Sequence, residues 1–135
     1  MLKILAAACI IVAGTAGSAL AQSSCSEPIA PAALNGSKAN LKQISEAAHD
    51  ANQFIKQSDD YQECLKQELI QKQQRAAHDK KQLDPSVGEQ VQSEIDESQK
   101  MKEKVGGEFQ IALQTFCRRD PKADPSCQKA LGQGQ

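Results

Sequence analysis

The stretch "LDPSVGE" (residues 83–89) separates two long segments that both have a helical pattern of apolar residues. Pro85 cannot continue a helix, and it biases Asp84 towards extended backbone geometry. Ser86 and Glu89 have the spacing of a capping box, which favours the start of a new helix. We therefore predict that one helix ends before this stretch and that another begins within it.

The segment before the turn predicts a helix over about residues 40–82. Asn40 suits an N-cap with Gln43 as its capping-box partner, and no Gly or Pro falls between Leu41 and Gln82. The apolar residues recur at steps of about three and four, which gives a narrow stripe along one face. This stripe contains Leu41, Ile44, Ala48, Ala51, Ile55, Leu65, Leu69 and Ala76.

The segment after the turn predicts a second helix over about residues 87–119. Gly106-Gly107 interrupts the helical propensity but not the spacing of the stripe. A close approach of the two helices or a mild kink is favoured there, and a true break stays open. The second stripe contains Val91, Ile95, Ser98, Lys102, Val105, Phe109, Ala112 and Phe116.

Two amphipathic helices joined by a short turn predict an all-α fold, a long antiparallel two-helix hairpin. The narrow stripes are typical of a coiled-coil seam. Folding the chain about the turn places Leu65 opposite Val105 and leaves Leu41 and Ile44 overhanging the end of the second helix. The two tails of the chain are available to cover this overhang.

The first residues have the pattern of a secretory signal peptide. Lys3 precedes an apolar core over residues 4–14, and small residues lead to Ala21. We place cleavage after Ala21, so residues 1–21 are the signal and Gln22 begins the mature chain. A lipoprotein signal at Cys9 is disfavoured because the apolar run continues past it. The core is shorter than the roughly 20 residues of a membrane span. We predict a periplasmic or secreted protein with no transmembrane segment in the mature chain.

Composition limits both the partners and the core. The formal net charge is −1, so no basic field is available to attract nucleic acid. Aromatic residues make up 3% of the chain, and Trp is missing. A large core is therefore not available, and crosslinks are expected to help hold the fold.

Removal of the signal leaves Cys25, Cys64, Cys117 and Cys127. An even number of cysteines in a small exported domain predicts disulfides. No Cys-x-x-Cys pair occurs and neither His lies near a Cys, which makes a metal site a weak alternative. Four cysteines allow three connectivities.

The tails favour one of these connectivities. Residues 22–39 form a Pro-rich tail that is predicted to be extended, and folding back along the first helix it can bring Cys25 to Cys64. Ile29 and Leu34 would then lie on that helix. Two prolines in the C-terminal tail, residues 120–135, allow Cys127 to return to Cys117. A bond between Cys64 and Cys117 is harder, since the hairpin separates them by about 18 Å.

The segments "CSEPIAPAALNGSKAN", "FIKQSDDYQECL" and "KVGGEFQIAL" together resemble a family of small, uncharacterised exported proteins of alphaproteobacteria. The resemblance covers Cys25 to about Phe116. The two recurrent cysteines of that family correspond to Cys25 and Cys64, and the resemblance therefore implies the same pairing. The segment "CRRDPKADPSC" is a departure from the family pattern. The resemblance implies no activity.

Three further motifs contain polar side chains of the kinds found in functional sites. "AAHD" occurs twice and contains both histidines, His49 and His78, but these lie about 43 Å apart on one helix and are predicted to be solvated. "SDDYQE" (residues 58–63) is predicted to be a solvated face with Tyr61 packed over a disulfide, since helical acids do not share one coordination sphere. "CRRDPK" (residues 117–122) is predicted to be a solvated terminus, with partner docking as the alternative.

We predict no catalytic residue, metal ligand or cofactor. The favoured function is that of an exported, non-enzymatic helical protein that contacts an unknown protein of the cell envelope or contributes to envelope structure. The alternatives are a periplasmic stress chaperone-like hairpin and, third, a metal carrier. Four residues off the stripes could be covered by the N-terminal tail in a monomer, which is favoured, or by a second hairpin in a dimer. They are Phe54, Tyr61, Met101 and Leu113.

Overall fold

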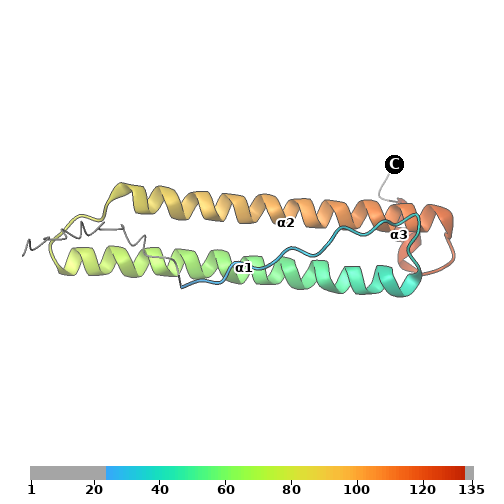
Figure 1. Ribbon diagram of the computed structural model, residues 1–135, viewed down its shortest axis with the longest axis horizontal. Coiled ribbons are helices and arrows are strands. Elements are labelled where there is room, and N and C mark those ends of the chain that lie inside the picture. Colours follow the sequence, from blue (N-terminus) through green and yellow to red (C-terminus); the bar gives the residue numbers. More distant parts are fainter. Residues whose placement is uncertain (1–23, 133–135) are drawn as a thin grey trace, which may run out of the picture.

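The computed structural model describes residues 24–132. The predicted signal, its cleavage site and Cys9 therefore lie outside the described residues. Over these described residues the chain is all-α and contains three helices, namely α1 (Leu41–His78), α2 (Pro85–Arg119) and α3 (Ser126–Gly132). The two long helices pack side by side as an antiparallel hairpin (Figure 1), as predicted. No helix in the described part is long and apolar enough to cross a membrane.

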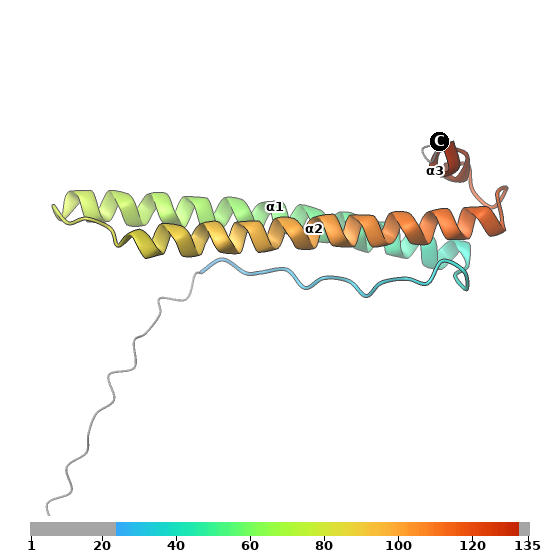
Figure 2. The same cartoon turned by 90° about the horizontal axis from the view of Figure 1, so that it is seen from above.

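Two covering segments lie against the hairpin. Residues 24–39, which we call the strap, are extended and run back along α1 and α2, as predicted for the N-terminal tail. Figure 2 shows the strap on one side of the hairpin and α3 on the other side. The C-terminal tail, predicted over residues 120–135, contains the short helix α3, which was not predicted from the sequence.

The ends of α1 show why the first helix is shorter than predicted. Asn40 caps the start, with its side chain accepting from the Gln43 backbone N–H and the Gln43 side chain accepting from the Asn40 N–H. Lys80 has a φ of 52°, and bonds from Lys80 N to Ala77 O and from Lys81 N to Ala76 O close a Schellman motif. The helix therefore ends at His78 rather than near residue 82.

Asp84 is the N-cap of α2, so the predicted capping box at Ser86 and Glu89 was wrong. The Asp84 carboxylate accepts from Ser86 N at 2.9 Å, and Pro85 occupies the first helical position. The Ser86 backbone and side-chain hydrogen bonds lower the pKa of Asp84.

The same tripeptide, Asp-Pro-Ser, begins α3. Asp124 accepts from Ser126 N at 2.8 Å, and hydrogen bonds from the Ser126 side chain and backbone lower the pKa of Asp124. One local motif therefore begins both helices.

The register of the hairpin differs from the prediction. Leu65 packs in a cluster with Val91 rather than with Val105, and Gln62 Nε2 donates to Ser98 Oγ at 3.1 Å. Because α1 ends four residues early, the turn moves towards the N-terminus and each residue of α1 meets an earlier residue of α2. Ile44 consequently packs with Phe116, and the predicted overhang of α1 was wrong.

The buried residues form three clusters spaced along the seam. The first, at the end where the tails meet, joins α1, α2 and α3 and contains Ala39, Ile44, Phe116, Cys117, Cys127 and Ala130. The second contains Ala51, Phe54 and Val105, and strap residue Ala30 packs against it. The third contains Tyr61, Leu65 and Val91, and Cys25 packs against it.

The strap covers two of the residues that lie off the predicted stripes. Phe54 is 3% exposed and Tyr61 is 8% exposed, whereas Met101 is 40% exposed. Leu34 packs against the first cluster, as predicted. The prediction that Ile29 lies on α1 was wrong, because its side chain is 92% exposed.

The strap turn packs directly onto the backbone of α2. Gly36 is buried, and a Cβ on it would lie 2.0 Å from Ala112 O. The Arg119 guanidinium lies 5.3 Å from the centre of the Phe116 ring and donates to the carbonyl oxygens of Ser37 and Ala39. The close backbone contact in this fold is therefore between the strap turn and α2, not between the two long helices.

Gly106-Gly107 neither breaks α2 nor permits a close helix approach. The helix is continuous through both residues, and a Cβ on either would have no atom within 4 Å. A close helix approach and a true break at this pair were therefore wrong, and a mild kink stays a prediction.

The turn end of the hairpin is thin. No residue between Leu65 and Val91 is buried, and the strap reaches this part only at Glu68, to which Ser24 donates. Two helices alone cover each other on one side only, so a fully enclosed core forms only where a third segment is added.

Candidate functional site

Both predicted disulfides are present. Cys25 and Cys64 have Cα atoms 5.8 Å apart, and Cys117 and Cys127 have Cα atoms 5.1 Å apart. The first bond fixes the start of the strap to the middle of α1, where Ser24 N also donates to Glu68 at 2.7 Å. The strap is thus tied at its start by the disulfide and at its end by the packing of its turn on α2.

Cys25, Cys64 and Glu68 form a group with the ligand types of a metal site. Both sulfur atoms belong to the disulfide, so neither is a thiolate that can bind a metal ion. Hydrogen bonds from Ser24 lower the pKa of Glu68. The group therefore acts as the anchor of the strap in the oxidised protein.

Three pockets follow one another along the line where the strap meets α1, and we call them together the strap groove. Their volumes are about 370, 220 and 300 Å³ in order from Cys64 to Gln43. The first and second share Gln57, and the second and third share Pro31 and Asp50. The groove is therefore continuous over about 30 Å of α1.

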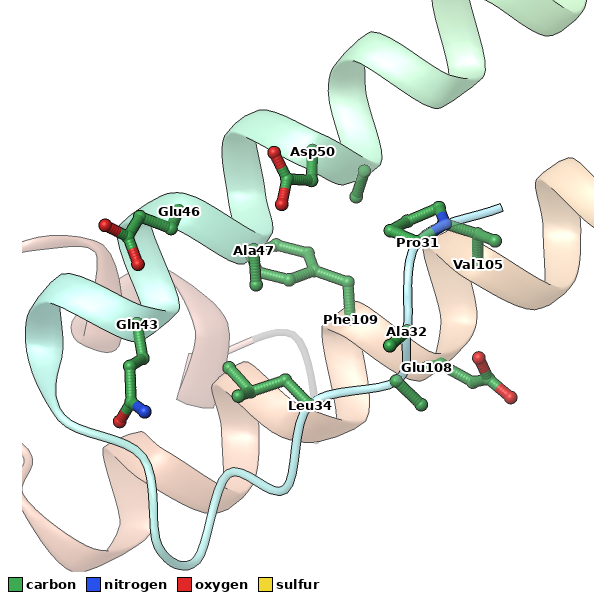
Figure 3. A pocket seen from close by; sticks show the side chains of 12 residues that line it. Pro31, Ala32, Leu34, Gln43, Glu46, Ala47, Asp50, Val105, Glu108 and Phe109 are labelled. Atoms are coloured by element: carbon green, nitrogen blue, oxygen red, sulfur yellow. The ribbon is translucent and has the colours of Figure 1, made fainter. Parts of the chain in front are cut away.

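The third pocket is the one part of the groove that is lined by the strap, α1 and α2 together. Figure 3 shows the Phe109 side chain reaching from α2 towards Ala47 of α1, with Leu34 and Pro31 contributed by the strap. Glu46 and Asp50 of α1 are at its edge. An apolar wall with carboxylates at the rim suits a ligand that has both apolar and positively charged parts.

The rim of the strap groove carries only negative charge. No Lys or Arg lines any of its three pockets. Of the lining carboxylates only Glu46 has an ion pair within residues 24–132, an exposed one with Lys42 at 3.6 Å. The lining carboxylates are Glu27, Glu46, Asp50, Asp60 and Glu108.

Tyr61 reports the same negative field from inside the groove. Burial first, and then the charges of Glu94, Glu27 and Glu97, raise the pKa of Tyr61 to about 12. The Tyr61 hydroxyl donates to Glu94 at 3.3 Å. Cys25 packs against the cluster that contains Tyr61.

Two of the three acids of "SDDYQE" lie outside the strap groove. Asp59 pairs with Lys102, and Glu63 accepts from Gln67 at 2.9 Å. Asp60 alone lines the groove. The acids thus do not share one site, but one of them contributes to a groove that the linear motif does not reveal.

The histidines lie on the surface. His49 is exposed, and His78 has a side chain that is 90% exposed and 3.2 Å from Asp79. Neither belongs to a group of metal-ligand type in the described chain. In "CRRDPK", Arg118 is exposed and Arg119 is used to hold the strap turn.

No family model matches the chain, and no curated protein or solved structure is similar to it. The resemblance to alphaproteobacterial exported proteins therefore stays a prediction.

Sequence reasoning missed the strap groove because its lining comes from three segments. The residues of the third pocket span positions 31 to 109, and no pattern within one helix places them together. One signal was present, since Glu46, Asp50 and Asp60 lie on the same side of α1 as Phe54 and Tyr61. The strap is predicted to run along this side of α1. The sequence therefore contains the acidic edge and the apolar floor of a groove, although not in one motif.

Proposed function

We propose that this chain is an exported helical protein of the periplasm or the extracellular space that acts by contact with another protein of the cell envelope. The single observation that supports this most is the disulfide-bonded strap, which adds a third segment along the two-helix hairpin. Two disulfides are typical of proteins that work in oxidising compartments. The contact surface extends along α1, which is about 57 Å long.

Neither alternative is favoured by a specific contact. The large exposed apolar side chains are spread out, with Leu41 and Ile70 separated by about 43 Å along α1, so they do not make one client-binding surface. The cysteines that a metal carrier would use are bonded to each other.

The contact function is tested by site-specific photo-crosslinking in the native host. A photoreactive residue is placed in turn at exposed positions on each face, including Gln53, Gln71 and Ile111, and adducts are identified by mass spectrometry. We expect one defined partner at a contiguous set of positions. A protein that is exported but gives no adduct at any position would contradict the proposal.

Export is tested separately on the same cells. The fraction that contains the protein and its N-terminal residue are measured by mass spectrometry. We expect a chain that begins at Gln22 outside the cytoplasm. Finding Met1 retained, or a lipid on Cys9, would contradict this expectation.

A further inference from the structure

We propose that the strap groove binds an extended, basic segment of a partner protein, with the apolar side chains of that segment in the pockets and its Lys or Arg side chains on the carboxylate rim. This inference deepens the proposed contact function and rests on it. It goes further in naming the surface and the chemistry of the partner.

The shape of the groove favours an extended peptide. The strap already shows that an extended, Pro-containing segment can lie along these helices, because residues 24–39 do so without forming a helix or strand beyond one turn. The groove beside it is linear and about 30 Å long, which matches roughly ten residues of extended chain. A globular surface would not reach into three pockets in a row.

The spacing of the pockets is regular. Gln57 and Asp50 mark the two borders between neighbouring pockets, and seven residues of helix span about 10 Å. A polyproline II segment advances about 9 Å every three residues, and these residues share one edge of the segment. Apolar side chains at every third position would therefore meet successive pockets.

The charge of the groove selects basic partners. Five carboxylates line it and no Lys or Arg does, and Glu46 alone among them pairs with a cation, the exposed Lys42, so an acidic segment would be repelled and a basic one attracted. Burial is the first cause of the raised pKa of Tyr61, which lines the first pocket, and the charges of Glu94, Glu27 and Glu97 raise it further. By contrast, the pocket between α2 and α3 on the other side contains Lys129 and no carboxylate.

The rim acids are open to a partner. Glu27, Glu46, Asp50 and Asp60 are exposed, and Glu108 is half-buried. Their helical neighbours on the rim, Gln53 and Gln57, are exposed as well. Neutralising the rim should therefore change binding without removing packing from the core.

The test uses the oxidised protein and a fluorescein-labelled peptide of four Leu-Pro-Lys repeats, read by fluorescence anisotropy. We expect saturable binding that weakens as salt is added. The groove variant Glu46→Gln/Asp50→Asn/Asp60→Asn should bind about tenfold more weakly. The matched control Glu63→Gln/Asp96→Asn/Glu103→Gln removes the same charge from exposed positions outside the groove and should bind like the unaltered protein.

A second variant and two further peptides separate the groove from charge alone. Ala47→Phe fills the third pocket without changing charge and should also weaken binding. A Leu-Pro-Glu peptide should not bind, and an Ala-Pro-Lys peptide should bind more weakly. Each of the following overturns the proposal: equal loss in both triple variants, equal binding of the Glu peptide, or full competition by spermidine together with equal binding of the Ala peptide.

The cell experiment distinguishes this inference from the contact function. Photoreactive residues at Gln53 and Gln57 report on the groove, and residues at Gln71 and Ile111 report on surfaces away from its lining. Adducts at the first pair with a basic segment of a partner support the groove. Adducts at the second pair alone would overturn the groove and leave the contact function standing, whereas adducts nowhere would overturn the contact function.

Discussion

The strap and α3 cover opposite sides of the same hairpin, and each is held by one disulfide. The strap has backbone hydrogen bonds of its own only in its turn, where Lys38 N and Ala39 N donate to Asn35 O, so ordering its sixteen residues (24–39) costs conformational entropy that contacts and the crosslink must offset. α3 is a short helix with its own cap at Asp124, and it returns to α2 after only ten residues. The comparison shows that an extended cover depends on a distant crosslink far more than a helical one does.

The largest effect should come from removing the two disulfides in turn. The chain-entropy model assigns about 4 kcal/mol to the bond between Cys25 and Cys64, whose separation is 39 residues. It assigns about 2.7 kcal/mol to the bond between Cys117 and Cys127, whose separation is 10 residues. Both free-energy differences are measured by urea unfolding of the variants Cys25→Ser/Cys64→Ser and Cys117→Ser/Cys127→Ser. An equal or larger loss for the second pair would contradict the difference between the two covers.

The second test concerns how closely the strap approaches α2. Gly36→Ala places a Cβ against the Ala112 backbone, and we expect a loss of about 2 kcal/mol or more in the free energy of unfolding. Gly107→Ala is the control, because its Cβ meets nothing within 4 Å. That change should stabilise the protein by about 0.5–1 kcal/mol through helix propensity. A neutral Gly36→Ala would mean that the strap turn is not seated on α2.

The third test measures the ionisation of Tyr61, which lies on the side of the hairpin that the strap covers. Tyr61 is the single Tyr of a chain that has no Trp, so absorbance at 295 nm follows its ionisation alone. We expect a midpoint near pH 12 in the oxidised protein. Because the folded pKa is raised, the stability that Tyr61 contributes is full below about pH 10 and is lost as the pH rises from about 10 to 12.

Releasing the strap should move this titration. The Cys25→Ser/Cys64→Ser variant loses the tie that holds Glu27 and Cys25 near Tyr61, and the midpoint should fall towards 10. Tyr61→Phe is the control for stability, and it should remove the pH dependence assigned to this group. An unchanged midpoint after strap release would show that the strap does not determine the environment of Tyr61.

The smallest effect is expected at the histidines. His49→Ala and His78→Ala should each change the free energy of unfolding by less than about 0.5 kcal/mol, because both side chains are exposed. Thermal melting with and without zinc measures this. A zinc-dependent rise in the melting temperature that either substitution abolishes would contradict the assignment of these residues to plain surface.

The two long helices and the turn between them could be predicted from local patterns, and the disulfide pairing from the reach of the two tails. Periodicity located both stripes, and Asn40 with Gln43 marked the start of α1. The register was missed because Lys80 adopts a left-handed conformation that usually selects Gly. The sequence carried no Gly at that position to show where the helix ends.

α3 and the candidate site were missed for different reasons. A seven-residue helix has too few positions to show a period, although the repeated Asp-Pro-Ser cap signalled its start. The strap groove depends on the path of an extended segment, and its third pocket joins strap, α1 and α2. The spacing of residues along one helix does not show how close the strap, α1 and α2 lie to one another.

Because the turn end is formed by the two helices alone, the length of the hairpin can change there without altering the rest of the fold. The strap bonds to α1 at Glu68, and no residue from 66 to 90 is buried. Removing or adding one heptad from each helix in this part would keep the stripes in phase, since both helices change by the same two turns. The strap, its anchor and the groove would stay as they are. The molecule is thus divided into a fixed part that carries the covers and an extension whose reach can vary independently.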